Sequence, residues 1–146
     1  MKIEDILAEK GTRVVTTHKK NLLVDVMSLF IANKIGSLVV VDKYDKIMGI
    51  VAPFDILKAV HTEPDNISTM MVSEIMTENV IAASPEDDTD DLLTIMTENR
   101  IRHIPVIKDG KLAGLISIGD VVKAHLTVQD VHIHYLKDYI EGKYPA

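Results

Sequence analysis

The sequence predicts a mixed α/β (α+β) fold in which two tandem β-α-β-β-α units pack face to face about a pseudo-twofold axis. The first observation behind this prediction is an internal repeat, because the two halves of the chain match over several blocks. The second is that short β-branched runs alternate with segments of helical apolar spacing in each half. The third is size, since one unit of roughly 60 residues buries a sheet face poorly by itself.

The repeat has an offset of 65 to 66 residues. Residues 33–40 align with residues 99–106 at an offset of 66, and residues 49–59 align with residues 114–124 at an offset of 65. One residue is lost in the turn between these blocks, as is usual for turns of duplicated units. The alignment predicts a first repeat at residues 1–62, a linker at 63–67, a second repeat at 68–126, and a C-terminal amphipathic helix within 127–146.

Each unit is expected to contain a short strand, a helix, two strands joined by a tight turn, and a closing helix. In the first unit these are strands 14–16, 38–41 and 47–51, a helix with the apolar stripe Leu22, Val26, Leu29 and Phe30, and a helix at 54–60. In the second unit they are strands 80–83, 104–107 and 112–117, a helix with the stripe Leu92, Ile95 and Met96, and a helix at 119–126. The motif Ser84-Pro85-Glu86-Asp87 predicts the start of the second unit's first helix, since it offers an N-cap, a proline and an acidic first turn.

The C-terminal helix is predicted at residues 128–140 and ends before Gly142. Its apolar side is formed by Val128, Val131, Tyr135, Leu136, Tyr139 and Ile140. Two alternatives stay open for this helix, which packs either on its own module or on a partner subunit.

The composition excludes several classes of protein. Acidic residues outnumber basic residues by 22 to 16, and the resulting charge of −6 disfavours binding to nucleic acid or to an anionic membrane. The chain has no Cys, which excludes disulfides and thiolate metal sites and is typical of a cytoplasmic protein. The N-terminus is charged, and the longest apolar run, 47–54, is far shorter than the ~20 residues of a membrane span, so we expect no membrane insertion.

The predicted start of the last helix suits a nucleotide. Ser117 and Asp120 lie where a strand ends and a helix begins, and an ionised carboxylate can accept hydrogen bonds from both vicinal hydroxyls of a ribose. Free N–H groups at a helix start attract phosphate, and the basic residues Arg102 and His103 precede a strand of the same unit. The alternative is structural, because Ser-x-x-Asp is also a common helix cap and the two basic residues also suit a solvated strand start.

The repeat order and the two Gly-h-h-x-x-x-Asp-h segments, in which h is apolar, resemble the CBS domain family, named for cystathionine β-synthase. Tandem pairs of these domains are called Bateman modules. The resemblance covers about 126 of the 146 residues, and the second copy, with residues 101–106 followed by 114–121, matches the family pattern closely.

The resemblance implies an adenosine site that the two copies share. Asp120 and Ser117 of the second copy would bind the ribose, and Arg102 and His103 would reach the phosphates across the central cleft. The adenine would be held by backbone groups and apolar side chains of the first copy, at Thr12, Val14, Ile35, Gly36 and Ser37.

The first copy departs from the family pattern. Ala52, followed by Pro53, stands where the family usually has Ser or Thr, although Asp55 is retained. The surface facing Asp55 would be formed by Val80, Ile101, Arg102 and Pro105. We therefore expect this second site to be weaker, altered or empty.

No metal site is expected. The acidic run at 86–91 has no glycine turn and no distal Glu at the spacing of a calcium loop, and it begins a helix whose dipole favours acidic residues. His132 and His134 are two residues apart, which places them on different sides of a helix.

The leading hypothesis is a sensor without catalytic activity. An adenosine ligand such as AMP, ADP, ATP or NAD would shift the packing of the two copies and so alter contact with a regulated protein. A homodimer is expected, because the helix faces of so small a protein would otherwise be exposed. The alternative is an adaptor dimer with vestigial nucleotide sites, and an enzyme is disfavoured because no nucleophile with a nearby base and no phosphate-binding glycine motif is present.

Overall fold

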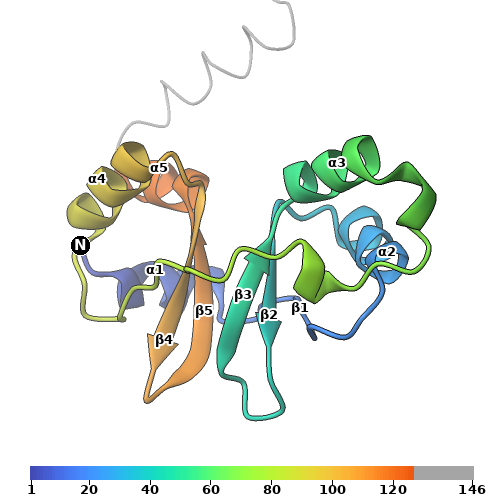
Figure 1. The fold of residues 1–146 in the computed structure, drawn as a ribbon. Helices are drawn as coiled ribbons and strands as arrows, with labels where there is room; N and C mark the ends of the chain where they lie inside the picture. The colour runs from blue at the N-terminus through green and yellow to red at the C-terminus, as the bar shows by residue number, and fades with distance from the viewer. Residues whose placement is uncertain (127–146) are drawn as a thin grey trace, which may run out of the picture.

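The computed structural model describes residues 1–126 and confirms a mixed α/β fold of two units that lie side by side (Figure 1). The first unit holds a three-stranded sheet in the order β1-β2-β3, and the second holds a two-stranded sheet. The strands are β1 (Thr16–Thr17), β2 (Leu38–Val41), β3 (Ile47–Val51), β4 (His103–Lys108) and β5 (Lys111–Ser117). The predicted C-terminal helix and the pair His132 and His134 lie outside the described residues.

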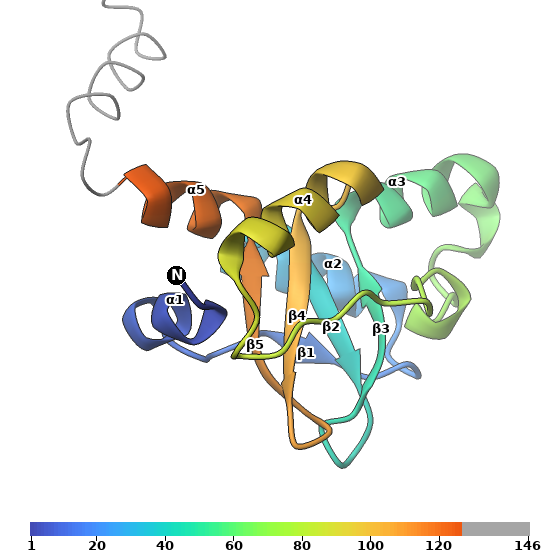
Figure 2. The same cartoon turned by 90° about the vertical axis from the view of Figure 1, so that its left-hand side faces the viewer.

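Five α-helices and two 3₁₀ turns are described within residues 1–126. They are α1 (Ile3–Lys10), α2 (Leu23–Asn33), α3 (Pro53–Thr62), η1 (Pro64–Asn66), η2 (Val72–Glu74), α4 (Thr89–Asn99) and α5 (Ile118–Leu126). In the turned view, α3, α4 and α5 lie along one side of the molecule, and the β2–β3 and β4–β5 turns lie at the opposite end (Figure 2).

The two units repeat each other in backbone detail as well as in order. The antiparallel register shifts between Val40 and Val41 in the first unit and between Val106 and Ile107 in the second. The helices that precede these strands end in left-handed residues at equivalent positions, Lys34 with φ 51° and Arg100 with φ 54°. The duplication predicted from the sequence is therefore also a duplication of bulges and helix ends.

Each hydrophobic core is completed by a short segment from the other repeat, the segment that comes just before that repeat's first strand. The core of the second unit includes Ile3, Ile6 and Leu7 of α1, which pack with buried residues of α4, β4, β5 and α5. The core of the first unit includes Met70 and Val72, which pack with α2, β2, β3 and α3. The two units have therefore exchanged their leading segments, and each unit covers its sheet with residues of the other repeat.

A glycine at the same place in both units permits this exchange. A Cβ at Gly114 in β5 would lie 2.7 Å from Leu7 Cδ2, and a Cβ at Gly49 in β3 would lie 2.8 Å from Met76 Sδ. Real side chains do not approach so closely. The glycine of the Gly-h-h-x-x-x-Asp-h segment thus makes room for the exchanged segment on each strand.

Backbone hydrogen bonds also join the two repeats. Ile50 in β3 donates its N–H to Thr77 O (3.0 Å) and accepts from Thr77 N–H (2.9 Å), so the exchanged segment pairs with the edge of the first sheet. At the hairpin turns, Leu112 N–H donates to Asp45 O at 3.0 Å. Because these groups are main-chain atoms, the two units are held in one register as well as in hydrophobic contact.

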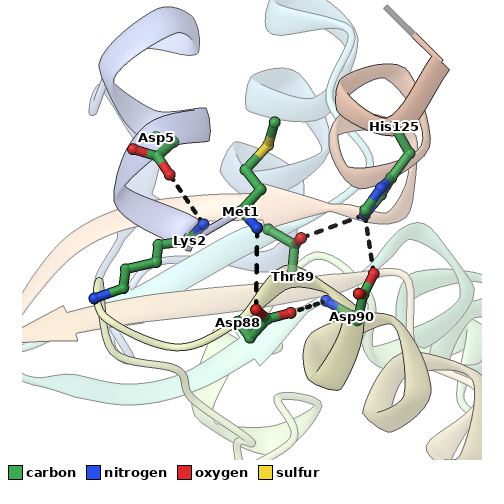
Figure 3. Close-up of polar contacts among 7 residues, drawn as sticks. All are labelled: Met1, Lys2, Asp5, Asp88, Thr89, Asp90 and His125. Carbon is green, nitrogen blue, oxygen red and sulfur yellow. Dashed lines mark hydrogen bonds and ion pairs between the residues drawn. The ribbon is translucent and has the colours of Figure 1, made fainter.

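The start of α4 differs from the prediction. The helix begins at Thr89, where the side chain of Asp88 accepts the Asp90 N–H (2.8 Å) and acts as the N-cap. Figure 3 shows the polar contacts that surround this start. Thr89 N–H donates to Met1 O (3.0 Å), the Met1 amine lies 4.0 Å from Asp88 Oδ2, and His125 Nε2 lies 3.3 Å from Thr89 Oγ1 and 3.2 Å from Asp90 Oδ1.

The prediction that the Ser84–Asp87 motif starts this helix is therefore wrong, because the helix begins two residues after the motif. Ser84 and Asp87 form a turn in which Ser84 N–H donates to the Asp87 carboxylate (2.8 Å), and Pro85 O and Asp87 O accept N–H groups of Glu4 and Ile3 (2.9 and 3.0 Å). The carbonyls of this turn are therefore used to hold the start of α1.

Smaller differences concern strands and apolar stripes. The predicted strand 80–83 is reduced to one bridge between Ala83 and Val106, and the predicted strand 14–16 forms as Thr16–Thr17. In α2 the buried stripe begins at Leu23, because Leu22 precedes the first turn and is 38% exposed.

We predict that damage to an exchanged segment loosens the opposite unit. Ile3→Ala removes a fully buried side chain and should lower the free energy of unfolding by about 2–5 kcal/mol, measured by chemical denaturation. Native-state hydrogen exchange should rise first in β4 and β5. The matched variant Val72→Ala, at the equivalent place in the other segment, should raise exchange first in β2 and β3. Loosening confined to the repeat that contains the substitution would contradict the exchange of segments.

Candidate functional site

Asp120 and Ser117 are fixed to each other at the start of α5. Ser117 N–H donates to Asp120 Oδ2 (2.8 Å), and Asp120 N–H donates to Ser117 Oγ (3.1 Å). These reciprocal bonds form a helix cap, so the structural reading of this pair is confirmed. The same bonds hold a half-buried carboxylate at the point where the two units meet, and the cap therefore also positions a hydrogen-bond acceptor.

A cavity of about 250 Å³ opens between the two units beside this cap. Its walls are formed by Lys10, Arg13, Val14, Val15, Ile35, Gly36 and Ser37 from the first repeat and His103, Leu115 and Ser117 from the second. Six of the residues predicted for one shared site are thus brought together. Asp120 lies just outside, in an adjoining cleft that also includes Lys10. We refer to the cavity together with Asp120 as the Asp120 site.

Two other predicted members of this site are placed differently. Thr12 is exposed and does not line the cavity. The Arg102 side chain is also exposed outside the cavity wall, while its carbonyl accepts the Ile118 N–H at 2.8 Å and so helps to fix the start of α5. His103 faces the first repeat, because a Cβ at Gly36 would lie 2.8 Å from its Cε1 atom. The glycine at position 36 therefore gives the imidazole its place in the cavity wall.

The hydroxyl of Ser37 is the most unusual group in the cavity. Its side chain is only 4% exposed, and Ser37 Oγ has no hydrogen-bond partner within residues 1–126. A buried hydroxyl that is left unpaired costs roughly 1–3 kcal/mol, so such groups normally have a partner. This hydroxyl is therefore suited to pair with a polar group that enters the cavity.

Lys10 is a member of the candidate site that the sequence did not predict. Its ammonium group donates to Leu115 O (2.7 Å) and forms an ion pair with Asp120 Oδ2 (2.5 Å). Residues 3, 6, 7 and 10 share one face of a helix, so Lys10 lies on the face that Ile3, Ile6 and Leu7 bury. A charged residue on an otherwise apolar helix face was the available signal.

The electrostatics of the site favour an ionised Asp120 and a neutral His103. Burial acts to raise the pKa of Asp120, but hydrogen bonds from Lys10 and Ser117 outweigh it and lower that pKa below its ordinary value. Burial lowers the pKa of His103, and the charges of Lys10 and Arg102 lower it further against the opposing effect of Asp120. These pKa shifts favour an anionic acceptor at Asp120 beside a neutral imidazole at His103.

The Asp55 site lacks these features. Asp55 is half-buried on α3 and its carboxylate accepts the Ala52 N–H at 2.8 Å, so the cap is retained, but Ala52 provides no hydroxyl. On the facing repeat, Pro105 is buried within β4, and Val80 and Ile101 are half-buried. The two sites therefore share a backbone arrangement and differ in their polar side chains.

The chain belongs to the CBS domain family. A family model described as CBS domain matches residues 3–62 and 72–127, so the chain is a tandem pair of CBS domains. Its sequence is 32% identical over 150 residues to the CBS domain-containing protein CBSX3, mitochondrial, of Arabidopsis thaliana, in an alignment that covers 97% of this chain and 73% of that relative.

Solved structures agree with this assignment. The CBS-domain containing protein ATU1752 from Agrobacterium tumefaciens has a TM-score of 0.81 and 40% identity, over 86% of this chain and 99% of that one. The CBS domain pair of protein MJ0100, solved in complex with 5′-methylthioadenosine and S-adenosyl-L-methionine, has a TM-score of 0.78 and 25% identity, over 88% and 98% of the two chains. The fold class predicted from the repeat is confirmed.

Two kinds of feature are absent from residues 1–126. None of the helices there combines the length and apolar character that a membrane-spanning segment requires. In that same part of the chain, no group of three or more His, Asp or Glu side chains is close enough to hold a metal ion.

We predict that His103 titrates below its ordinary pKa of 6.5. Because the folded value lies below the unfolded one, the stability that neutral His103 contributes is present above pH 6.5 and is lost as the pH falls through 6.5 toward the folded pKa. NMR titration of the ring should give the pKa. Thermal unfolding of His103→Gln between pH 7 and pH 5 should show a weaker pH dependence than wild type. A ring pKa at or above 6.5 would overturn the prediction.

Proposed function

We propose that the protein is a regulatory module that binds an adenosine-containing nucleotide, such as AMP, ADP, ATP or NAD, at the Asp120 site. The observation that carries this proposal is the unpaired, buried Ser37 hydroxyl in a cavity that also presents the capped Asp120 carboxylate. The bound adenosine compounds of the MJ0100 domain pair support the same ligand class. In this proposal the protein is cytoplasmic and binds its ligand without catalysing a reaction.

The roles of the residues follow from their chemistry. Asp120 is ionised and accepts hydrogen bonds from the ribose hydroxyls. Ser37 pairs with a polar edge of the adenine, while Val14 and Ile35 provide the apolar contacts that a purine ring needs. Neutral His103 donates an N–H to the phosphate side of the ligand, and Arg102 reaches the same side from outside the wall.

Ligand binding at this place would couple to the packing of the two repeats. The walls come from both repeats, so a bound nucleotide contacts α1 and the segment 35–37 of one and β4 and β5 of the other. A ligand shifts the equilibrium between two arrangements of the units only if it binds one arrangement more tightly than the other. A site with walls from both units changes shape when the units move, so its affinity differs between the arrangements. A regulated protein would then respond to the arrangement of the units.

The Asp55 site is proposed to be the weaker of the two. Ala52 removes the hydroxyl, and Arg102 is the one basic residue among those expected to face this site, whereas Lys10, Arg13 and His103 line the cavity of the Asp120 site. A phosphorylated ligand would therefore find fewer donors there than at Asp120.

A homodimer is the second part of the proposal. The helices α3 and α5, which lie on one side of the molecule (Figure 2), expose Phe54 (70%), Leu57 (63%), Val60 (39%) and Val122 (42%). Apolar side chains gathered on one face of a small protein mark an interaction surface. A twofold pairing of two copies through α3 and α5 would cover them.

The alternative function is an adaptor whose nucleotide sites are vestigial. The exposed apolar side chains of α3 and α5 favour it, because they serve a partner protein as well as a second copy. Ligand binding separates the two functions, since an adaptor requires none.

We predict that Asp120→Ala abolishes ligand binding. In a panel of AMP, ADP, ATP, NAD and S-adenosylmethionine, at least one compound should raise the melting temperature of wild type, because a ligand at 100 times its Kd stabilises the native state by about 2.7 kcal/mol. The matched control is Asp55→Ala, which also removes a helix-capping carboxylate. We expect at least tenfold weaker binding for Asp120→Ala and less than threefold for Asp55→Ala in isothermal titration calorimetry. Wild type that responds to none of the compounds would favour the adaptor.

We predict that Leu57→Glu dissociates the dimer. Leu57 is 63% exposed, so the substitution leaves the fold intact while it places a charge in the proposed contact. Light scattering after size-exclusion chromatography should change from the mass of two chains to the mass of one. The control is Ile31→Glu, an equally exposed apolar position on α2 (76%), which should leave the mass unchanged. A wild-type monomer, or a Leu57→Glu dimer, would contradict the pairing.

A further inference from the structure

We propose that Lys10 is a specificity-determining residue of the Asp120 site, which selects adenosine ligands that carry negative charge over neutral or cationic ones. The inference rests on the proposed function, since it concerns the charge of the ligand that this site takes. The inference goes beyond the proposed function because it assigns the selection of ligands by charge to the Lys10–Asp120 ion pair, which, within residues 1–126, only one of the two sites has.

The ion pair occupies the ribose acceptor in the ligand-free chain. The hydrogen bonds described for the Asp120 carboxylate all fall on Oδ2, which accepts from Lys10 Nζ at 2.5 Å and from Ser117 N–H at 2.8 Å. A vicinal diol binds a carboxylate best when each hydroxyl donates to its own oxygen. A ribose that engages both oxygens must therefore displace the Lys10 ammonium from Oδ2.

Displacing the ammonium has a different consequence for each class of ligand. The Lys10 and Asp120 side chains are 35% and 23% exposed, so the pair is partly withdrawn from water and its loss is less well compensated by hydration than at an open surface. A neutral adenosine takes the carboxylate and provides no anion in exchange, which leaves Lys10 only the more exposed carboxylates of Asp5 and Glu9 in the adjoining cleft. A ligand with a phosphate provides a new anionic partner, and the ammonium exchanges one anion for another.

The space and the charges around Lys10 allow its ammonium group to move from Asp120 to a bound phosphate. Lys10 lines the cavity and also the adjoining cleft of about 560 Å³, which extends along α1 and α5, so its side chain has space to move away from Asp120. The cavity wall contains Lys10 and Arg13 and no acidic side chain, whereas the acidic side chains of Asp5, Glu9 and Asp120 line the adjoining cleft. A positive wall repels a sulfonium such as that of S-adenosylmethionine and attracts phosphate.

The test compares ADP, adenosine and S-adenosylmethionine with the full chain and Lys10→Met in isothermal titration calorimetry. Wild type should bind ADP at least tenfold more tightly than adenosine or S-adenosylmethionine. In Lys10→Met, ADP should bind more weakly and adenosine more tightly, so that the ratio of their Kd values falls at least tenfold. The conservative variant Lys10→Arg should keep the wild-type preference, because it keeps the charge.

The matched control is Lys2→Met, which removes the same charge from the other end of the same helix, where the ammonium points away from the polar contacts around it (Figure 3). It should leave both the affinities and the ratio unchanged. If wild type binds these ligands and Lys10→Met keeps the wild-type ratio, the role of Lys10 is overturned and the proposed function stands. If wild type binds none of them, the role of Lys10 falls, and the proposed function falls with it only if AMP, ATP and NAD also fail to bind.

Discussion

The exchange of leading segments between the two repeats is the constraint on which the rest of the structure depends. A unit of this size cannot cover its sheet alone, and each takes its cover from the sequence before the other. Because α1 must cross to the second core, its last residue, Lys10, arrives beside Asp120. The same crossing carries Arg13 and Val14 along the boundary and so forms the cavity. The candidate site is thus a result of how the cores are completed.

The two motif glycines show how closely local sequence and global packing agree. Gly49 and Gly114 stand at equivalent places on β3 and β5, and each allows an exchanged segment to lie directly on the strand. After each strand an aspartate caps the helix that follows by accepting the N–H of the residue three positions earlier, Ala52 in one unit and Ser117 in the other. One short motif therefore sets the packing of one segment and the position of one carboxylate. Because the motif has these two structural roles in each unit, the Gly-h-h-x-x-x-Asp-h pattern is visible in both copies.

Most of the fold and half of the site could be predicted from the sequence, because both follow from a repeat with clear periodicity. Ser117, Ser37, Gly36 and His103 meet in one cavity, as the resemblance to the CBS domain family implied. The start of α4 could not be predicted, since the contact with Met1 that helps to fix it is distant in sequence. Lys10 was missed because its partner is 110 residues away: the apolar helix face marks the charge as unusual, but nothing local identifies Asp120 as its partner.

The exchanged segments also have a consequence for the history of the chain. An ancestor with one repeat would have had no second segment of its own, so it would have completed its core only by trading segments with an identical copy. Such an ancestor would have been an obligate dimer with two equal ligand sites. After fusion of two copies into one gene, the two sites could change independently. The difference between Lys10 with Ser117 at one site and Ala52 at the other is a change of this kind.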